Sequence, residues 1–286
     1  MKKSILFLSV FFLSFASLLA QKSPSLKIMT YNLRYDNPDD GINAWPKRNA
    51  NVALLIKKYN PDLLGIQEGL HHQLLNLDSL LKDYAWVGVG RDDGKTKGEY
   101  AAIFYRKSRF KLLDQGSFWL SETPSKAGSI GWDAACVRIV SWAKFFDKMA
   151  KRVVFHFNTH FDYKGIIAQR ESAALLAKMA DSIAKNEAKI YTGDFNTPIT
   201  DSCMIRLISP AEKYPVKDSR QISANPSSGP NYSYVSFDPD FTPTVLIDHI
   251  LVSKQFNVKT HHVCNEKYGN WYPSDHLAVV VELGWQ

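Results

Sequence analysis

The sequence predicts an α/β fold, because short apolar runs typical of strands alternate along the chain with longer amphipathic stretches. The chain has 286 residues, of which 45% are hydrophobic and 22% charged, so it can bury a substantial core. No linker, internal repeat or low-complexity tract divides it. We therefore expect one domain over residues 21–286, preceded by a separate N-terminal segment.

The spacing of apolar residues predicts the individual elements. Residues 48–59 have a helical pattern that stops before Pro61, and the same spacing predicts helices over residues 70–81 and 166–185. Residues 213–244 are rich in Pro, Ser and Asn, which favours a long loop region. Shorter apolar runs predict strands at residues 26–33, 63–67, 84–89, 101–105, 110–115, 137–146, 152–159, 189–192, 245–252, 257–263 and 277–283.

The first 20 residues have the pattern of a signal peptide. Lys2 and Lys3 precede an apolar run over residues 5–15, and Ala16 or Ala20 supplies a small residue for cleavage. The run is short for a membrane span, although an uncleaved anchor is the alternative. We expect a secreted or periplasmic protein with no stable membrane insertion after the signal peptide is removed.

Charge and cysteine content narrow the function classes. The formal net charge is +7, but the basic residues are spread along the chain, so nucleic acid is one possible partner among other phosphate-bearing molecules. Cys136, Cys203 and Cys264 allow at most one disulfide, have no zinc spacing and sit in no recognisable nucleophile setting. A thiol mechanism is therefore disfavoured. We expect a monomer.

Polar residues of four types lie at the ends of the predicted strands or just beyond them. A sheet presents its strand ends together, so residues far apart in the chain can meet in one pocket. Asn, Asp and Glu offer the hard oxygen ligands that favour Mg²⁺, Mn²⁺ or Ca²⁺ over zinc. This pattern indicates a metal-assisted hydrolase, and its members are Asn32, Glu68, His160, Asp194, Asn196, Asp248, Asp275 and His276.

Six short motifs contain these residues: TYN (30–32), QE (67–68), NTH (158–160), GDFN (193–196), IDH (247–249) and SDH (274–276). Because it has these six motifs in this order, the chain resembles the endonuclease/exonuclease/phosphatase superfamily. That superfamily includes deoxyribonuclease I, inositol polyphosphate 5-phosphatases and poly(A) deadenylases. The resemblance covers nearly the whole mature chain. It implies a four-layer α/β sandwich, with two mixed β-sheets packed face to face, helices outside, and the active site across one edge.

The resemblance also implies a Mg²⁺ site, which Mn²⁺ could fill as well. Glu68 would be the principal metal ligand, with Asn32 beside it and Asp275 as a further ligand or metal-site carboxylate. Such a metal polarises the phosphoryl oxygens and offsets charge on the leaving oxygen.

The same resemblance assigns the proton chemistry of an in-line attack by water. Asp194 would take the proton from the attacking water, and Asn196 would orient that water or a phosphate oxygen. His276 would bind the phosphate and stabilise the charge of its transition state, while Asp248 holds the imidazole in one tautomer and orientation.

A second histidine, His160, matches a catalytic His that a Glu supports in deoxyribonuclease I, and Glu99 is the candidate for that Glu. The alternative interpretation of Glu99 is a solvated loop charge. Arg138 is a candidate phosphate-binding residue, or a strand residue whose charge is satisfied within the fold.

Departures from the family's branches narrow the substrate. The run Leu246–His249 lacks the Trp-Cys-Asp-Arg signature of the inositol 5-phosphatases, and the YNLRYDN start resembles a secreted subgroup near the deadenylase-like branch.

We expect hydrolysis of a phosphodiester, with nucleic acid as one candidate. The alternatives are a phosphomonoesterase or phospholipase-type enzyme acting on sugar phosphates or lipid head groups, and a catalytically silent binding protein. Tryptophan-bearing loops at 119–124 and 131–139 are expected to wall a small-molecule pocket.

Overall fold

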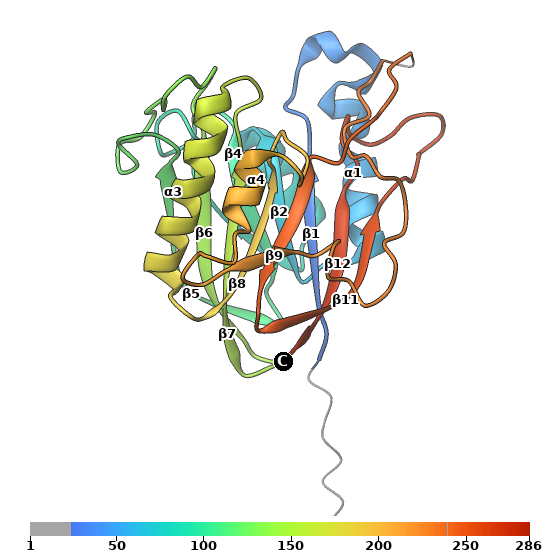
Figure 1. Ribbon diagram of the computed structural model, residues 1–286. Helices are drawn as coiled ribbons and strands as arrows, with labels where there is room; N and C mark the ends of the chain where they lie inside the picture. Colours follow the sequence, from blue (N-terminus) through green and yellow to red (C-terminus); the bar gives the residue numbers. More distant parts are fainter. Residues whose placement is uncertain (1–23, 239) are drawn as a thin grey trace, which may run out of the picture.

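A computed structural model describes residues 24–238 and 240–286 and shows two six-stranded mixed sheets packed face to face (Figure 1). In spatial order the first sheet contains β11 (Phe256–Val263), β12 (Val279–Trp285), β1 (Leu26–Asn32), β2 (Leu63–Gly69), β4 (Tyr100–Arg106) and β3 (Tyr84–Val87). The second contains β5 (Phe110–Trp119), β6 (Ile139–Asp147), β7 (Arg152–His160), β8 (Ala188–Asp194), β10 (Asp248–Ser253) and β9 (Val216–Asp218).

Helices cover the outer face of each sheet and complete the four layers. On the first sheet lie α1 (Trp45–Tyr59) and α2 (His71–Leu80), with the 3-10 helix η1 (Pro38–Asn43) beside α1. On the second lie α3 (Ile166–Ala184) and the short α4 (Ser202–Leu207). The α/β sandwich implied by the resemblance is confirmed.

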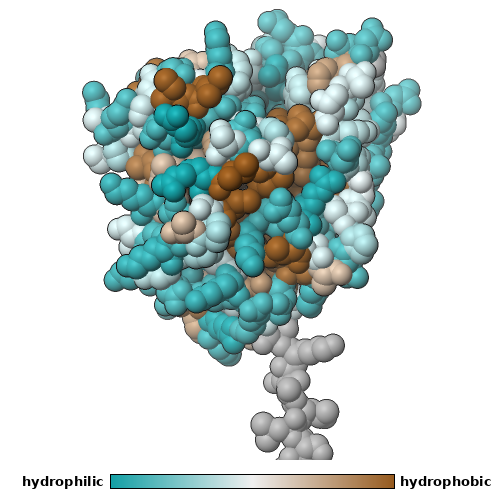
Figure 2. All heavy atoms as spheres, in the orientation of Figure 1, coloured by the Kyte–Doolittle hydropathy of each residue, from teal (hydrophilic) through white to brown (hydrophobic). Residues whose placement is uncertain are grey.

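Side chains along each strand point alternately to the two faces of the sheet. Apolar side chains therefore form three layers, one between the sheets and one under the helices on each side. On β1, Leu26 and Ile28 face the space between the sheets, whereas Met29 and Tyr31 face the layer that α1 and α2 cover. The outer face of α3 and α4 is mostly hydrophilic, and smaller apolar patches interrupt it, one of them at the upper end of α3 (Figure 2). Within the described residues, no helix has the length and apolarity needed to cross a membrane.

Most predicted elements exist, with shifted ends. The strand expected at 245–252 begins only at Asp248, and the first predicted helix starts earlier, at Trp45. The short strand β9 forms inside the predicted loop region 213–244, and α4 forms where no element was predicted. The predicted signal peptide lies outside the described residues, so export of the protein stays a prediction.

A polar cluster joins the two sheets close to the edge where β1 and β2 end. Gln67 on β2 donates to Asn158 on β7 over 2.7 Å, and Thr192 on β8 donates to the same amide oxygen over 2.9 Å. Gly65 leaves room for this cluster, because a Cβ there would lie 2.1 Å from the Thr192 hydroxyl. Two residues of the sequence motifs, Gln67 and Asn158, therefore hold the sheets together rather than line a pocket.

The pairing of the strands gathers the chemistry at one edge. Parallel β1 and β2 end there, as do parallel β7 and β8. Antiparallel β10 begins there, so that Asp248 lies directly opposite Asp194 in the ladder. The described N-terminal end and the C-terminus lie at the far end of the molecule (Figure 1).

Candidate active site

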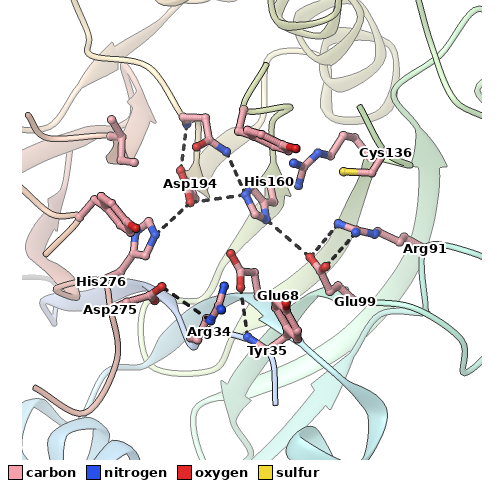
Figure 3. A pocket seen from close by; sticks show the side chains of 15 residues that line it. Arg34, Tyr35, Glu68, Arg91, Glu99, Cys136, His160, Asp194, Asp275 and His276 are labelled. Carbon is pink, nitrogen blue, oxygen red and sulfur yellow. Dashed lines mark hydrogen bonds and ion pairs between the residues drawn. The ribbon is translucent and has the colours of Figure 1, made fainter. Parts of the chain in front are cut away.

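The candidate site is a cavity of about 490 Å³ at this edge, with side chains reaching it from both sheets (Figure 3). Asn32 and Asp248 lie directly behind its wall and contact residues that line it. The structure therefore brings all ten predicted site residues together, and those that line the cavity are Glu68, Glu99, Arg138, His160, Asp194, Asn196, Asp275 and His276.

Asp248 and His276 form a buried hydrogen-bonded pair. The Nδ1 atom of His276 donates to Asp248 Oδ2 over 2.8 Å, and the other ring nitrogen, Nε2, lies 3.6 Å from Asp194 Oδ2. Burial disfavours the imidazolium, but the charges of Asp248 and Asp194 outweigh it and raise the pKa of His276 well above its ordinary value. The imidazole is thus oriented by one carboxylate and presents a positive charge to the cavity.

Asp194 sits at the centre of the site. Its Oδ1 atom accepts the backbone N–H of Asn196 over 2.9 Å, and its Oδ2 atom accepts the amide of Asn32 over 3.0 Å. Burial and the nearby charge of Asp248 raise the pKa of Asp194 to about 7. A carboxylate with such a pKa can take and return a proton near neutral pH, which is the property a general base needs.

Glu68 and Asp275 share the neighbouring part of the cavity. Glu68 Oε1 accepts the Asn32 amide over 3.0 Å, and Oε2 accepts the backbone N–H of Tyr35 over 3.1 Å. Burial raises the pKa of Asp275 to about 6, with the charge of Glu68 acting in the same direction. Arg34 Nε lies 3.9 Å from Asp275 Oδ2 and offsets part of this negative charge.

The residues fit the predicted divalent cation. Glu68 and Asp275 both line the cavity and offer carboxylate oxygens, the ligands that Mg²⁺ or Mn²⁺ prefers. A cation there would also offset the charge of Glu68 that helps to raise the pKa of Asp275. Asn32 presents its amide nitrogen to Glu68, and its Oδ1 atom accepts the backbone N–H of Arg34 over 2.9 Å. The amide would have to turn before its oxygen could bind a metal.

Asp194, Asp248 and His276 form a second possible cation group, with ligand atoms within 4.8 Å of one another. His276 Nδ1 is already engaged with Asp248, and its raised pKa favours the protonated ring, which cannot bind a metal. The geometry of this group therefore fits proton and phosphate handling better than it fits a cation.

His160 and Glu99 lie across the cavity from His276. His160 Nε2 accepts from the Asn196 amide over 3.0 Å, and His160 Nδ1 lies 4.0 Å from Glu99 Oε2. Burial, aided by Arg138 and Arg91, lowers the pKa of His160 well below its ordinary value, so the ring is neutral. Arg91 holds Glu99 through two hydrogen bonds of 2.7 and 2.8 Å, which makes Glu99 a cavity residue rather than a solvated loop charge.

Arg138 directly precedes β6. The sequence left two roles open for it, a phosphate-binding residue and a residue whose charge is satisfied within the fold, and the structure is compatible with both. Its Nε atom donates to the buried carboxylate of Asp162 over 3.3 Å, while its side chain lines the cavity. Asp162 also accepts the backbone N–H groups of Ala135 and Gly165, so the carboxylate that binds the Arg138 guanidinium is itself fixed in place. Arg138 is therefore a satisfied residue that still offers positive charge to the site.

Other cavity residues were not indicated by the motifs. Tyr35, Tyr163 and Tyr234 line the cavity together with Arg91, which lies on the glycine-rich loop after β3. Of the two loops expected to wall the pocket, 131–139 contributes Cys136 and Arg138, whereas no described residue of 119–124 and no described tryptophan lines the cavity. Tyrosines and arginines in loops carry no periodic signal, which is why sequence reasoning missed them.

Three residues of the site have a left-handed backbone without being glycine. Their φ angles are +58° for Arg34, +63° for Glu68 and +54° for Asn196. At Glu68 the ladder between β2 and β4 shifts register, so a β-bulge turns this side chain into the cavity. Such a conformation costs about 1–3 kcal/mol and persists where the surrounding structure enforces it, commonly at functional sites.

Comparison with known proteins identifies relatives of this fold. A model described as the Endonuclease/Exonuclease/phosphatase family matches residues 29–276. An endonuclease/exonuclease/phosphatase from Bacteroides vulgatus is 37% identical, with 92% of this chain and 100% of that chain covered and a TM-score of 0.86. A mannosyl-6-phosphatase from Bacteroides thetaiotaomicron is also 37% identical, over 91% of this chain and 100% of that chain, with a TM-score of 0.85. The catalytic domain of human Nocturnin, at 20% identity and a TM-score of 0.73, shares the fold over 93% of this chain and 95% of its own.

Proposed function

Because the chain belongs to the endonuclease/exonuclease/phosphatase family, whose members hydrolyse phosphoric esters, we propose that it is a Mg²⁺-dependent phosphatase for a small phosphate monoester, such as a sugar phosphate. The observation that carries the proposal is the convergence of Asp194, the Asp248–His276 pair and the Glu68 side in one cavity. Its volume of about 490 Å³ suits one small molecule. The similarity to a mannosyl-6-phosphatase supports a sugar phosphate.

The chain's own groups supply most of the chemistry of this proposal. Asp194, with a pKa of about 7, takes the proton of a water that lies between it and the phosphorus atom. Asn196, whose backbone N–H already fixes Asp194, orients that water through its amide. The protonated His276 donates to a phosphoryl oxygen and stabilises the charge that develops there.

In this proposal, the leaving oxygen lies near the wall of the cavity that is opposite His276. His160 is neutral, with its Nε2 atom accepting from Asn196 and its Nδ1 proton directed toward Glu99, so it positions Asn196 and the departing alkoxide takes its proton from solvent water. Arg138 adds positive charge beside His160. When bound at Glu68 and Asp275, Mg²⁺ would supply further positive charge to the phosphoryl and leaving oxygens.

A substrate panel with Mg²⁺ and Mn²⁺ tests the reaction class. We expect mannose 6-phosphate and related hexose phosphates to be hydrolysed with kcat/KM at least about tenfold above that for bis-p-nitrophenyl phosphate. Faster cleavage of the diester, DNA or RNA would overturn the monoester proposal in favour of the phosphodiesterase that the sequence alone favoured. A folded protein inactive on the whole panel would indicate a binding protein.

The metal assignment is tested by Glu68→Gln, which removes the charge and keeps the shape. We expect kcat to fall by about 10²-fold or more at limiting Mg²⁺, because the main negative ligand is lost. EDTA should silence the wild type, and added Mg²⁺ or Mn²⁺ should restore it. Glu187→Gln, at an exposed position just before β8, is the matched control and should keep wild-type turnover. Unchanged turnover of Glu68→Gln would show that the metal lies elsewhere.

A further inference from the structure

A second cavity, of about 310 Å³, lies outside the catalytic pocket at the edge strand β5. The indole rings of Trp119 and Trp142 line it, and so do Gly88 and Gly94 from the loop after β3. We call this cavity the tryptophan slot. Its volume is at the lower end of the range for small-molecule sites, so it suits one ring-sized group or two.

Glycines are required for the shape of the tryptophan slot. A Cβ at Gly116, which pairs with Trp142 across β5 and β6, would lie 2.8 Å from the indole nitrogen of Trp142. A Cβ at Gly94 would lie 3.2 Å from the edge of the Trp119 ring, and Gly94 has a φ angle of +68°. An aromatic ring over a strand glycine is a known way to stabilise an edge strand, and it accounts for Trp142 alone. It does not account for the cavity at the edge of β5, where Trp119 lines the face of the sheet opposite Trp142.

The chemistry of the slot differs from that of the catalytic pocket. None of the described residues that line it carries a charge, so an anion would find no counter-charge there. Polar groups are present all the same, from Gln115, Ser117 and the Trp142 indole N–H, which makes no hydrogen bond to any described residue. Aromatic faces combined with neutral hydrogen-bonding groups match a ligand that has apolar ring faces and many hydroxyl groups.

We propose that the tryptophan slot binds a neutral saccharide, with a sugar ring against Trp142. One loop separates this slot from the catalytic pocket: Gly88, Val89 and Gly94 line the slot, while Arg91 and Glu99 line the pocket. The Trp119 indole N–H donates to the backbone oxygen of Arg91 over 2.6 Å and fixes this loop from the slot side. The slot thus offers neutral sugar units a place beside, and separate from, the site for the phosphate ester.

Isothermal titration of the full mature chain with neutral oligosaccharides of mannose, glucose and galactose tests this proposal. We expect saturable binding of at least one of them to the wild type, and a loss of about tenfold or more in affinity for Trp142→Ala, the usual scale for removing an aromatic anchor. Trp271→Ala is the matched control, because Trp271 is a 42% exposed tryptophan that does not line the slot. The Trp271→Ala variant should bind the oligosaccharide with wild-type affinity.

Trp142→Ala should hydrolyse p-nitrophenyl phosphate at the wild-type rate. The titration measures saccharide binding without turnover, so its result does not depend on the proposed phosphatase activity. If Trp142→Ala fails to fold, Gln115→Ala, an exposed change on β5, takes its place and should weaken binding several-fold. The proposal is overturned if no oligosaccharide binds the wild type, if the slot variant binds as tightly as the wild type, or if only the Trp271 control loses affinity.

Discussion

Asp248 and His276 are 28 residues apart in the chain, yet their side chains meet over 2.8 Å because β10 begins, and β12 follows, at the same edge. The family resemblance carried by the sequence motifs implied this pair and the nearness of Asp194, but not the burial of the pair. The motifs could not predict that Asn32 turns its amide nitrogen, rather than its oxygen, toward Glu68 and Asp194. That orientation depends on a backbone N–H of Arg34, whose left-handed conformation has no signal in the sequence.

Substitution of the pair tests whether it acts as one unit. We expect His276→Ala to lower kcat by about 10²-fold or more, the scale for losing one preorganised electrostatic contact. Asp248→Asn should also lower kcat strongly, because an amide can favour the wrong tautomer of His276. The double variant should be little worse than His276→Ala alone, since Asp248 acts through the imidazole. Penalties in kcat that simply add would show that the two residues act independently.

His156 predicts how acid affects stability. It is fully buried between the sheets, with Nε2 2.7 Å from the Thr192 hydroxyl, and burial lowers its pKa to about 3. The unfolded chain, with a histidine pKa near 6.5, binds the proton first as pH falls, so folding stability drops between about pH 6.5 and 3, by up to about 1.4 kcal/mol per pH unit. His156→Gln removes this titration.

Urea unfolding at several pH values measures the effect of His156. The free energy of unfolding of His156→Gln relative to wild type should rise as pH falls from about 6.5, because only the wild type pays for the buried histidine. This comparison cancels the opposite contributions of the carboxyl groups with raised pKa, such as Asp194. A difference that stays constant with pH would contradict the buried neutral state.

At the scale of elements, periodicity predicted the long helices and the apolar strands because their faces are buried along their whole length. It failed where an element is short or irregular. The bulge in β2 that turns Glu68 into the cavity arises from its pairing with β4, which the local sequence does not encode. The strand β9 has three residues and exists because β10 offers it an edge. Non-local pairing of this kind leaves no local pattern.

The loop between β6 and β7 offers a test of backbone strain away from the site. Lys151 has a φ angle of +57°, which disfavours a residue with a Cβ. Lys151→Gly should therefore raise the free energy of unfolding by about 0.5–1 kcal/mol, as measured by urea titration. Met149→Gly is the matched control: Met149 is 58% exposed in the same loop and is not among the positive-φ residues, so glycine there should lower stability. Equal effects at both positions would argue against strain at Lys151.

At the scale of the whole molecule, the two sheets are joined at both ends by polar groups. Near the active site the link is the neutral Gln67–Asn158 cluster. At the far end it is Arg109, which donates to Asp147 of the second sheet over 2.8 Å and to Asp62, next to β2 of the first, over 2.8 Å. Neither contact could be predicted from sequence spacing, since each joins segments 38 or more residues apart.

The Arg109 link should contribute to stability without affecting catalysis. The side chain of Asp147 has no exposure, and that of Arg109 is only 4% exposed, so Arg109→Met leaves a buried carboxylate without its counter-charge. We expect a loss of about 3–5 kcal/mol in the free energy of unfolding. Adding Asp147→Asn should recover part of this loss, because the amide removes the uncompensated charge and its oxygen can still accept the backbone N–H groups of Met149 and Ala150. Since the link lies at the end opposite the cavity, kcat of the folded variants at low temperature should equal that of the wild type. A double variant less stable than Arg109→Met, or a fall in kcat, would mean that the far ends of the sheets also position the active site.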